Sequence, residues 1–257
     1  MSSKDSIAKT LTVATLLCVV CSVIVSTAAV LLKPAQIANK ELDFKRNILS
    51  AAGLLDPAST VEKQFENIVV KMVDLETGKF STAVSPDGYD QTKAAKEPST
   101  SQPLPKSDDI AKIGRVEDYA KVYIAQTDSG KKIVVLPVRG YGLWGTLYGF
   151  LAVEGDMNTV VGLGFYDHKE TPGLGGEVDN PRWKALWPGK KLFNPDGSIA
   201  IAVIKGSVDT SAKGSEHKVD GLSGATLTTK GVHNLIQFWL GEDGYGPFIA
   251  NMKKGKA

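Results

Sequence analysis

Cysteine is almost absent from this 257-residue sequence, which contains only Cys18 and Cys21. Both lie in an apolar N-terminal segment, so the rest of the chain can form neither a disulfide framework nor an all-cysteine metal or iron–sulfur site. Their C-x-x-C spacing places them on one helical face, where a metal or redox pair is one interpretation. Two small apolar residues in a membrane span are the simpler interpretation, and we adopt it.

An excess of one charge is lacking too. Thirty Lys and Arg residues nearly balance 28 Asp and Glu residues, and no basic stripe indicates a nucleic-acid surface. We therefore expect no nucleic-acid partner. The three histidines, His168, His217 and His233, have no partners at metal-ligand spacing. The sequence also contains no phosphate-binding P-loop and no sign of a Ser-His-Asp triad, so neither a metal site nor a hydrolase site is predicted.

Charged residues are absent from a long run near the N-terminus. Residues 11–32 are 22 residues without a charge, and at ~1.5 Å per residue such a helix crosses a ~30 Å hydrocarbon core. We predict a transmembrane helix over residues 11–32, after a short tail of residues 1–10. A cleavable signal peptide is the alternative, because Lys4 and Lys9 precede the run and small residues occupy 26–29. The apolar run continues beyond that point, which favours the anchor.

The remaining chain is predicted to contain a membrane-proximal region, residues 33–110, and a core domain, residues 111–257. Pro34 suits the first turn of a helix, and apolar residues follow at helical spacing, so a second helix is expected from there to about Gly53. A strand is predicted next, and then a surface loop without apolar periodicity. The strand covers residues 69–75 and the loop covers residues 81–109.

The core domain alternates apolar runs with turn signals. Strands are predicted over residues 120–126, 133–138, 146–153, 159–166 and 199–204, and a helix over residues 230–240. Asp128-Ser129-Gly130, between the first two strands, is a hairpin signal. The predicted fold class is therefore α+β, with a single N-terminal transmembrane helix followed by a twisted, mostly antiparallel sheet.

A run of small residues and hydroxyls precedes the predicted helix of the core domain. It reads Asp220-Gly221-Leu222-Ser223-Gly224-Ala225-Thr226, followed by Leu-Thr-Thr-Lys. Backbone N–H groups in such a run can approach phosphate oxygens, and the positive N-terminal end of the helix favours an anion. The alternative is an ordinary loop whose hydroxyls cap a helix.

A second glycine-rich motif, Gly140-Tyr141-Gly142-Leu143-Trp144-Gly145, follows a predicted strand. Leu143 and Trp144 would offer a flat apolar surface to an aromatic ring system, whereas the alternative is a β-turn with a core tryptophan. The residues of this motif match the G-x-G-x-x-G pattern of dinucleotide-binding loops. The residues that follow have the pattern of a strand rather than a helix, so dinucleotide binding is rejected.

A third motif is His168-Lys169-Glu170-Thr171-Pro172-Gly173-Leu174-Gly175-Gly176-Glu177. A proline and three glycines in ten residues are typical of a functional loop. Its backbone N–H groups and Thr171 are suited to the polar edge of a bound ring system, and nearby charge would tune the reduction potential of a redox-active ring. Glu170 and Glu177 are either such tuning charges or solvated side chains, and a structural role is expected for His168.

Together these motifs resemble the C subunit of bacterial Na+-translocating NADH:quinone reductases, over nearly the whole chain. The resemblance implies that FMN is esterified through its phosphate to the last threonine of S-G-A-T, here Thr226. Ser223, Gly224, Ala225 and Asp220 complete that attachment motif. We expect two further segments to hold the flavin ring: Gly142, Leu143 and Trp144 in the turn, and Glu170, Thr171, Leu174 and Gly175 in the loop.

The resemblance also implies partners and a location. The family forms a six-subunit complex of the bacterial inner membrane that passes electrons from NADH to ubiquinone and exports Na+, in which this subunit relays electrons and catalyses nothing alone. A separate flavin transferase attaches FMN outside the cytoplasm, so the domain is expected on the periplasmic side, although the count of flanking basic residues favours the opposite side. Two alternatives stay open. They are the G subunit of the related ferredoxin/NAD-coupled complex, and a membrane-anchored scaffold without flavin.

Overall fold

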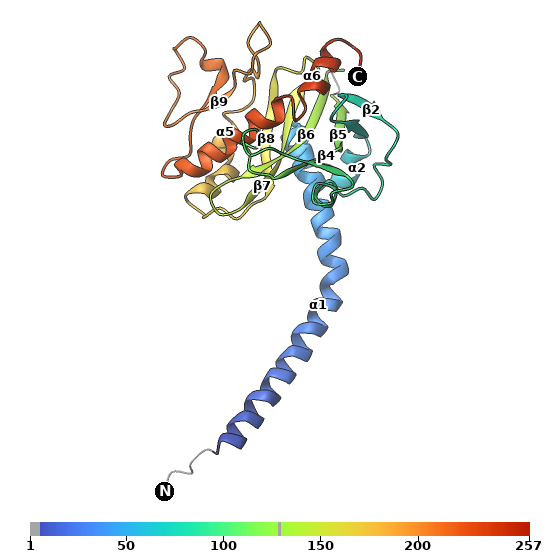
Figure 1. Cartoon of the computed structure of the whole chain (residues 1–257), viewed down its shortest axis with the longest axis vertical. Helices are drawn as coiled ribbons and strands as arrows, with labels where there is room; N and C mark the ends of the chain where they lie inside the picture. The colour runs from blue at the N-terminus through green and yellow to red at the C-terminus, as the bar shows by residue number, and fades with distance from the viewer. Residues whose placement is uncertain (1–5, 128–129) are drawn as a thin grey trace. The chain divides into compact units, whose positions relative to one another are not determined.

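The computed structural model describes residues 6–127 and 130–257 (Figure 1). The chain divides into two units, one ending at Asp43 and one running from Phe44 to Ala257. The proposed division of the second part into a membrane-proximal region and a core domain at residues 110 and 111 stays a prediction. Asp128 and Ser129 of the predicted hairpin turn lie outside the described residues.

Helix α1 runs from Ile7 to Ala51 and has Pro34 inside it. It contains an 18-residue window of mean hydropathy 2.6, none of it buried, so its length and composition suit a membrane span. The prediction of a second helix beginning at Pro34 is wrong, because α1 continues through this residue. Proline removes one backbone hydrogen bond, but its fixed φ of about −65° is itself helical.

A six-stranded sheet forms the framework of the second unit, in the order β2-β1-β5-β6-β7-β8. Every pair of neighbouring strands is antiparallel. This confirms the α+β class and the four long core strands predicted from the sequence, as well as the strand before them. The strands are β1 (Val69–Asp74), β2 (Lys79–Ser81), β5 (Tyr119–Gln126), β6 (Lys132–Tyr141), β7 (Thr146–Glu154) and β8 (Val160–Asp167).

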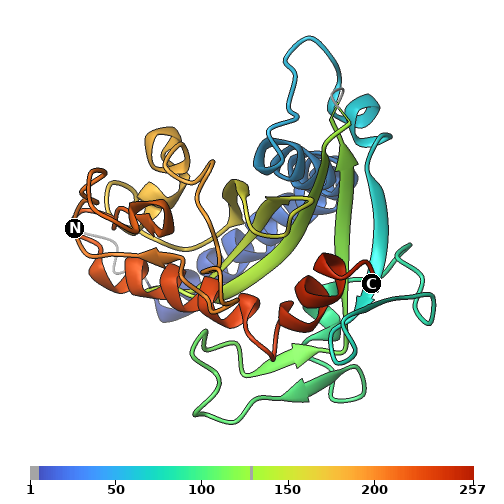
Figure 2. The same ribbon diagram turned by 90° about the horizontal axis from the view of Figure 1, so that it is seen from above.

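Two C-terminal helices, α5 (Thr226–Leu240) and α6 (Gly246–Lys253), lie along one face of this curved sheet (Figure 2). The predicted apolar face of α5, which includes Leu235 and Trp239, is buried in the main core. Leu151 of β7 belongs to the core that packs against α5. Successive side chains of a strand point to opposite faces of the sheet, so its neighbour Phe150 projects from the other face. There its ring lies 5.0 Å from the ring of Phe44, in the last turns of α1.

Short elements complete the second unit, and several of them differ from the predictions. The predicted strand over residues 199–204 is reduced to β9 (Ala202–Val203), which pairs in parallel with β10 (Lys218–Val219). The predicted loop over residues 81–109 contains a helical turn, α3, and a strand, β3. The sequence did not predict them, because elements this short show no apolar periodicity. The remaining bounds are α2 (Val61–Phe65), α3 (Gln91–Ala94), β3 (Ser101–Pro103), β4 (Arg115–Glu117), η1 (Gly175–Asp179), α4 (Pro181–Lys184) and η2 (Ser215–His217).

A buried ion pair connects β4 to the main sheet. Glu117 Oε2 lies 2.6 Å from Nη2 of Arg139 in β6, and both side chains are almost fully enclosed. Gln91 Nε2 donates a further hydrogen bond to Glu117 Oε1 at 2.5 Å, and Trp239 Nε1 donates to the Arg139 carbonyl at 2.7 Å. Burial by itself lowers the pKa of Arg139, but the Glu117 carboxylate more than offsets this and the pKa is raised.

Candidate functional site

The turn between β6 and β7 presents a large aromatic side chain to solvent. Gly142 N donates to the Gly145 carbonyl at 2.8 Å and closes the turn. Trp144, at its tip, is 63% exposed, and Leu143 beside it is also exposed. The interpretation of this turn as one with a core tryptophan is therefore wrong. Exposed apolar side chains of this size, grouped on one turn, indicate a binding surface.

Glu170 lies three residues after the end of β8 and connects this turn to α5. Its side chain is buried, with only 5% of the residue exposed. Its Oε1 accepts hydrogen bonds from Leu143 N at 3.0 Å and Trp144 N at 2.9 Å. Its Oε2 accepts from Thr228 Oγ1 at 2.5 Å, in the first turn of α5. The three motifs found in the sequence thus meet at one carboxylate.

Two glycines allow the segments to approach each other closely. A Cβ on Gly175 would lie 2.5 Å from both Glu170 Oε2 and Thr228 Oγ1, so only glycine fits beside this hydrogen bond. Gly224 has a φ of +70°, in the left-handed region that side chains rarely adopt, and a Cβ there would be 3.2 Å from Leu174 Cδ2. The 168–177 loop and the S-G-A-T segment therefore adjoin.

The hydroxyls near the start of α5 fall into two classes. Thr228 and Thr229 are buried and engaged, since Thr228 donates to Glu170 and Thr229 Oγ1 accepts from Leu222 N at 2.9 Å. Ser223 and Thr226 are exposed. Thr226 is the first residue of the 15-residue helix α5, where unpaired backbone N–H groups and the helix dipole favour a negatively charged group. The accessible threonine of the motif therefore stands at the position best suited to a phosphate.

Other residues of the predicted site support the framework around it. Asp220 Oδ1 accepts from Val208 N at 2.9 Å, and the Asp220 carbonyl accepts from Trp183 Nε1 at 2.9 Å. These two hydrogen bonds fix the position of Asp220, which lies just before the S-G-A-T segment. His168 Nε2 is 2.7 Å from Asp179 Oδ2, which supports the structural role expected for this histidine.

Two exposed apolar residues were not selected from the sequence. Leu227 is 58% exposed in the first turn of α5, and Tyr141 is exposed at the end of β6. The sequence does carry a signal for Leu227, because it lies off the helical stripe formed by the apolar residues of α5. Together with Leu143, Trp144 and Leu174 they form what we call the apolar rim, contributed by the three segments that meet at Glu170.

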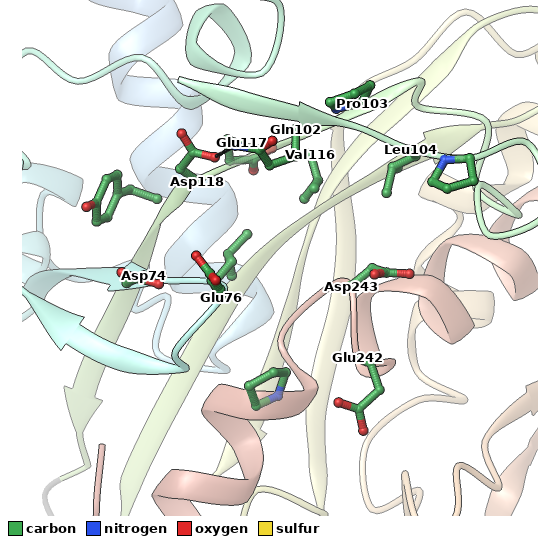
Figure 3. A pocket seen from close by; sticks show the side chains of 14 residues that line it. Asp74, Glu76, Gln102, Pro103, Leu104, Val116, Glu117, Asp118, Glu242 and Asp243 are labelled. Atoms are coloured by element: carbon green, nitrogen blue, oxygen red, sulfur yellow. Dashed lines mark hydrogen bonds between the residues drawn. The ribbon is translucent and has the colours of Figure 1, made fainter. Parts of the chain in front are cut away.

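A cavity of about 780 Å³ elsewhere in the second unit has a different character (Figure 3). Six of the side chains lining it are acidic, none is basic, and none belongs to the three motifs. Carboxylates repel an anionic phosphate, so this cavity is unsuited to the group expected at Thr226. The acidic residues are Asp74, Glu76, Glu117, Asp118, Glu242 and Asp243. Within the described part of the chain, no cluster of three or more His, Cys, Asp or Glu side chains is placed to hold a metal ion.

Comparisons with known proteins identify the domain in which the three motifs lie. The model of the FMN-binding domain family matches residues 142–241, a range that contains the 168–177 and 220–226 motifs and the third motif from Gly142 onward. Among curated proteins, the chain is similar to the C subunit of the Na(+)-translocating NADH-quinone reductase of Pseudomonas aeruginosa, with 55% identity over the full length of both. The corresponding protein of Vibrio vulnificus is 47% identical, over 99% of each chain.

Solved structures show the same likeness. The crystal structure of Shewanella oneidensis NqrC superposes with a TM-score of 0.77 and 37% identity, covering 84% of this chain and 99% of that one. The structure of the C subunit of the Na(+)-translocating NADH-quinone reductase from Parabacteroides distasonis gives a TM-score of 0.65 and 28% identity, covering 85% and 96% of the two chains.

Proposed function

The chain belongs to the family formed by the C subunit of the Na+-translocating NADH-quinone reductases, and from this premise we propose that it carries FMN joined through its phosphate to Thr226. As one component of that oxidoreductase it relays electrons and is not catalytic alone. Bound FMN supplies reversible electron transfer, and the residues of the chain bind and orient it. The full-length similarity to proteins named as the C subunit favours this assignment over the G subunit of the related complex.

The assignment to Thr226 is supported by the accessibility of its hydroxyl. Of the two buried threonine hydroxyls nearby, Thr228 donates to Glu170 and Thr229 accepts from a backbone N–H, so a modifying enzyme would have to break the local structure to reach them. Ser223 is accessible, but Thr226 alone stands at the helix N-terminus. A phosphate there would accept hydrogen bonds from the free N–H groups of the first turn. Ser223, Gly224 and Ala225 are proposed to line its other side.

The flavin ring is proposed to lie against the apolar rim. Trp144 and Leu143 offer apolar surface to its face, while Thr171 and the backbone around Leu174 and Gly175 serve its polar edge. The four side chains are exposed in the protein, so one edge of the ring would remain accessible to a redox partner. A covalent link would retain the cofactor at such an open surface through many cycles.

The wider assembly is also a proposal. We place the chain in a six-subunit complex of the bacterial inner membrane that passes electrons from NADH to ubiquinone and exports Na+. The apolar part of α1 would be its single membrane span, and the FMN-binding domain would lie on the periplasmic side. A dedicated flavin transferase would move FMN from FAD to the Thr226 hydroxyl, breaking the FAD pyrophosphate bond and releasing AMP, since a threonine hydroxyl is a poor nucleophile without an enzyme to activate it.

A series of hydroxyl variants tests the proposal. Thr226→Val, expressed with the transferase, should yield folded protein whose band on a denaturing gel shows no flavin fluorescence under ultraviolet light. Ser223→Ala, the matched control at the other exposed hydroxyl, should keep covalent flavin. A fluorescent Thr226→Val band would contradict the assignment. A dark wild-type band would instead support the flavin-free scaffold.

A further inference from the structure

Glu170 is a buried acid whose hydrogen-bond partners lie on two separate segments. A buried carboxylate is costly unless its oxygens are satisfied by donors. Here the three donors are neutral: the N–H groups of Leu143 and Trp144, and the hydroxyl of Thr228. They lie 27, 26 and 58 residues away in the sequence. This carboxylate therefore makes long-range connections within the region proposed to hold FMN.

We infer that Glu170 is a positioning residue, which fixes the turn carrying Trp144 against the first turn of α5 and so sets the flavin ring relative to its attachment point. This inference rests on the proposed function. Trp144 is 63% exposed, so its side chain has little packing of its own to hold the turn in place. The two backbone hydrogen bonds to Glu170 supply that restraint directly. Thr228, two residues after Thr226, links the same carboxylate to the attachment site.

The position of the side chain argues against a role based mainly on charge. Both carboxylate oxygens already accept hydrogen bonds from the turn and the helix. A glutamine at this position keeps the essential connections, because its Oε1 can accept from Leu143 and Trp144 while its amide N–H donates to Thr228 Oγ1. Glu170→Gln therefore removes the charge but keeps the connections, whereas Glu170→Ala removes both.

The experiment uses the full-length chain with these two variants and Glu177→Ala as a control. Glu177 belongs to the same loop, but its Oε2 accepts from Asn180 Nδ2, outside the turn and α5. Hydrogen exchange is measured at the amides of Leu143 and Trp144 in protein expressed without the transferase. The flavin reduction potential and visible spectrum are measured in the assembled complex that contains each flavinylated variant.

The expected results separate position from charge. In Glu170→Ala, exchange at the two amides should rise by roughly tenfold to a hundredfold, because each amide loses a charge-assisted hydrogen bond. The flavin potential and spectrum should change in the same variant, while covalent flavin is retained. Glu170→Gln should keep both readouts close to those of the wild type. Glu177→Ala should leave the amide exchange unchanged, because its carboxylate accepts from Asn180 rather than from the turn.

Three results would overturn the inference. Unchanged amide exchange in Glu170→Ala would show that the turn needs no such restraint. A potential unchanged in Glu170→Ala would show that the restraint does not affect the flavin. A shift in Glu170→Gln as large as in Glu170→Ala would assign the effect to charge. If Glu170→Ala fails to fold, Thr228→Val serves in its place, because it removes one of the three donors to Glu170. This variant should produce a smaller change in the amide exchange and in the flavin potential. Unchanged values of both in Thr228→Val would also refute the inference.

A failure of the proposed function would give a different experimental result from a failure of this inference. Wild-type protein without covalent flavin would refute the assignment of Thr226, whereas the amide-exchange result in flavin-free protein would still test whether Glu170 restrains the turn.

Discussion

Glu117 and Glu170 are both buried carboxylates, but their surroundings differ in kind. Glu117 pairs with the Arg139 guanidinium, with Glu117 Oε2 2.6 Å from Arg139 Nη2, and joins β4 to β6. Among the described residues, the donors to Glu170 are all neutral, and they belong to a turn and a helix start rather than to paired strands. The first carboxylate supports the framework of the sheet. The second connects the β6–β7 turn to the first turn of α5.

This difference shows how the fold separates stability from function. The region around Glu117 also contains Trp239 and Tyr245, which are completely buried, and both donate hydrogen bonds to the backbone of β6. The region around Glu170 displays exposed apolar side chains, and Thr226 is among its accessible hydroxyls. Substitutions in the first region should therefore mainly affect unfolding, and those in the second should mainly affect the flavin.

The largest effect on stability is expected from Glu117→Ala. It leaves the buried Arg139 charge without its partner, which typically costs about 3–5 kcal/mol. Denaturant unfolding monitored by circular dichroism measures this loss, and the folded fraction should still accept flavin. A loss below about 1 kcal/mol would remove the distinction between the two regions.

Thr228→Val should have a smaller effect on stability. It removes the hydroxyl that donates to Glu170 Oε2, and an unsatisfied buried acceptor costs about 1–3 kcal/mol. Thr228→Ser retains the hydroxyl and serves as the control in the same unfolding measurement. Equal stability of the valine and serine variants would argue that this hydrogen bond contributes nothing.

Gly224→Ala probes the loop that is proposed to carry the flavin. The φ of +70° at this position costs a residue with a Cβ about 1–2 kcal/mol. The strain falls two residues before Thr226, so we expect slower flavin attachment as well as a lower unfolding midpoint. A time course of in-gel fluorescence checks the first effect, with Gly197→Ala as a control. Gly197 also has a positive φ but lies outside the motifs. Attachment at the same rate in both variants would show that loop conformation is unimportant.

Trp144→Ala should change stability least, by no more than about 0.5 kcal/mol, because the side chain is largely exposed. Its effect should appear in the flavin instead. The phosphoester should survive, while the flavin fluorescence or reduction potential changes because the ring loses an apolar contact. Redox titration and emission spectra that match the wild type would count against ring contact at this residue.

Much of the framework could be read from the sequence because its signals are local. Alternation predicted the long strands, and helical spacing predicted the buried face of α5. The sequence pattern predicts that α5 starts at Lys230, whereas the helix starts at Thr226, because the hydroxyls of its first turn have the composition of a loop. Pro34 suggested a helix start, whereas α1 continues through it.

The motifs predict which residues belong to the candidate site, but they do not predict how these residues are arranged in space. Glu170 was considered as a tuning charge or a solvated side chain, and its burial between two distant segments depends on how β8 returns beside the β6–β7 turn. That arrangement is a tertiary property, with contacts separated by 26 to 58 residues. Leu227 was not predicted, because a single apolar residue off the buried stripe of a helix is common on protein surfaces.

The most direct test is mass spectrometry of the tryptic peptide spanning residues 219–230, prepared from the protein in its native complex. This peptide contains four candidate hydroxyls, at Ser223, Thr226, Thr228 and Thr229. We predict a mass increase equal to FMN less one water, with fragmentation assigning it to Thr226. An unmodified peptide, or an adduct on one of the other three hydroxyls, would contradict the account.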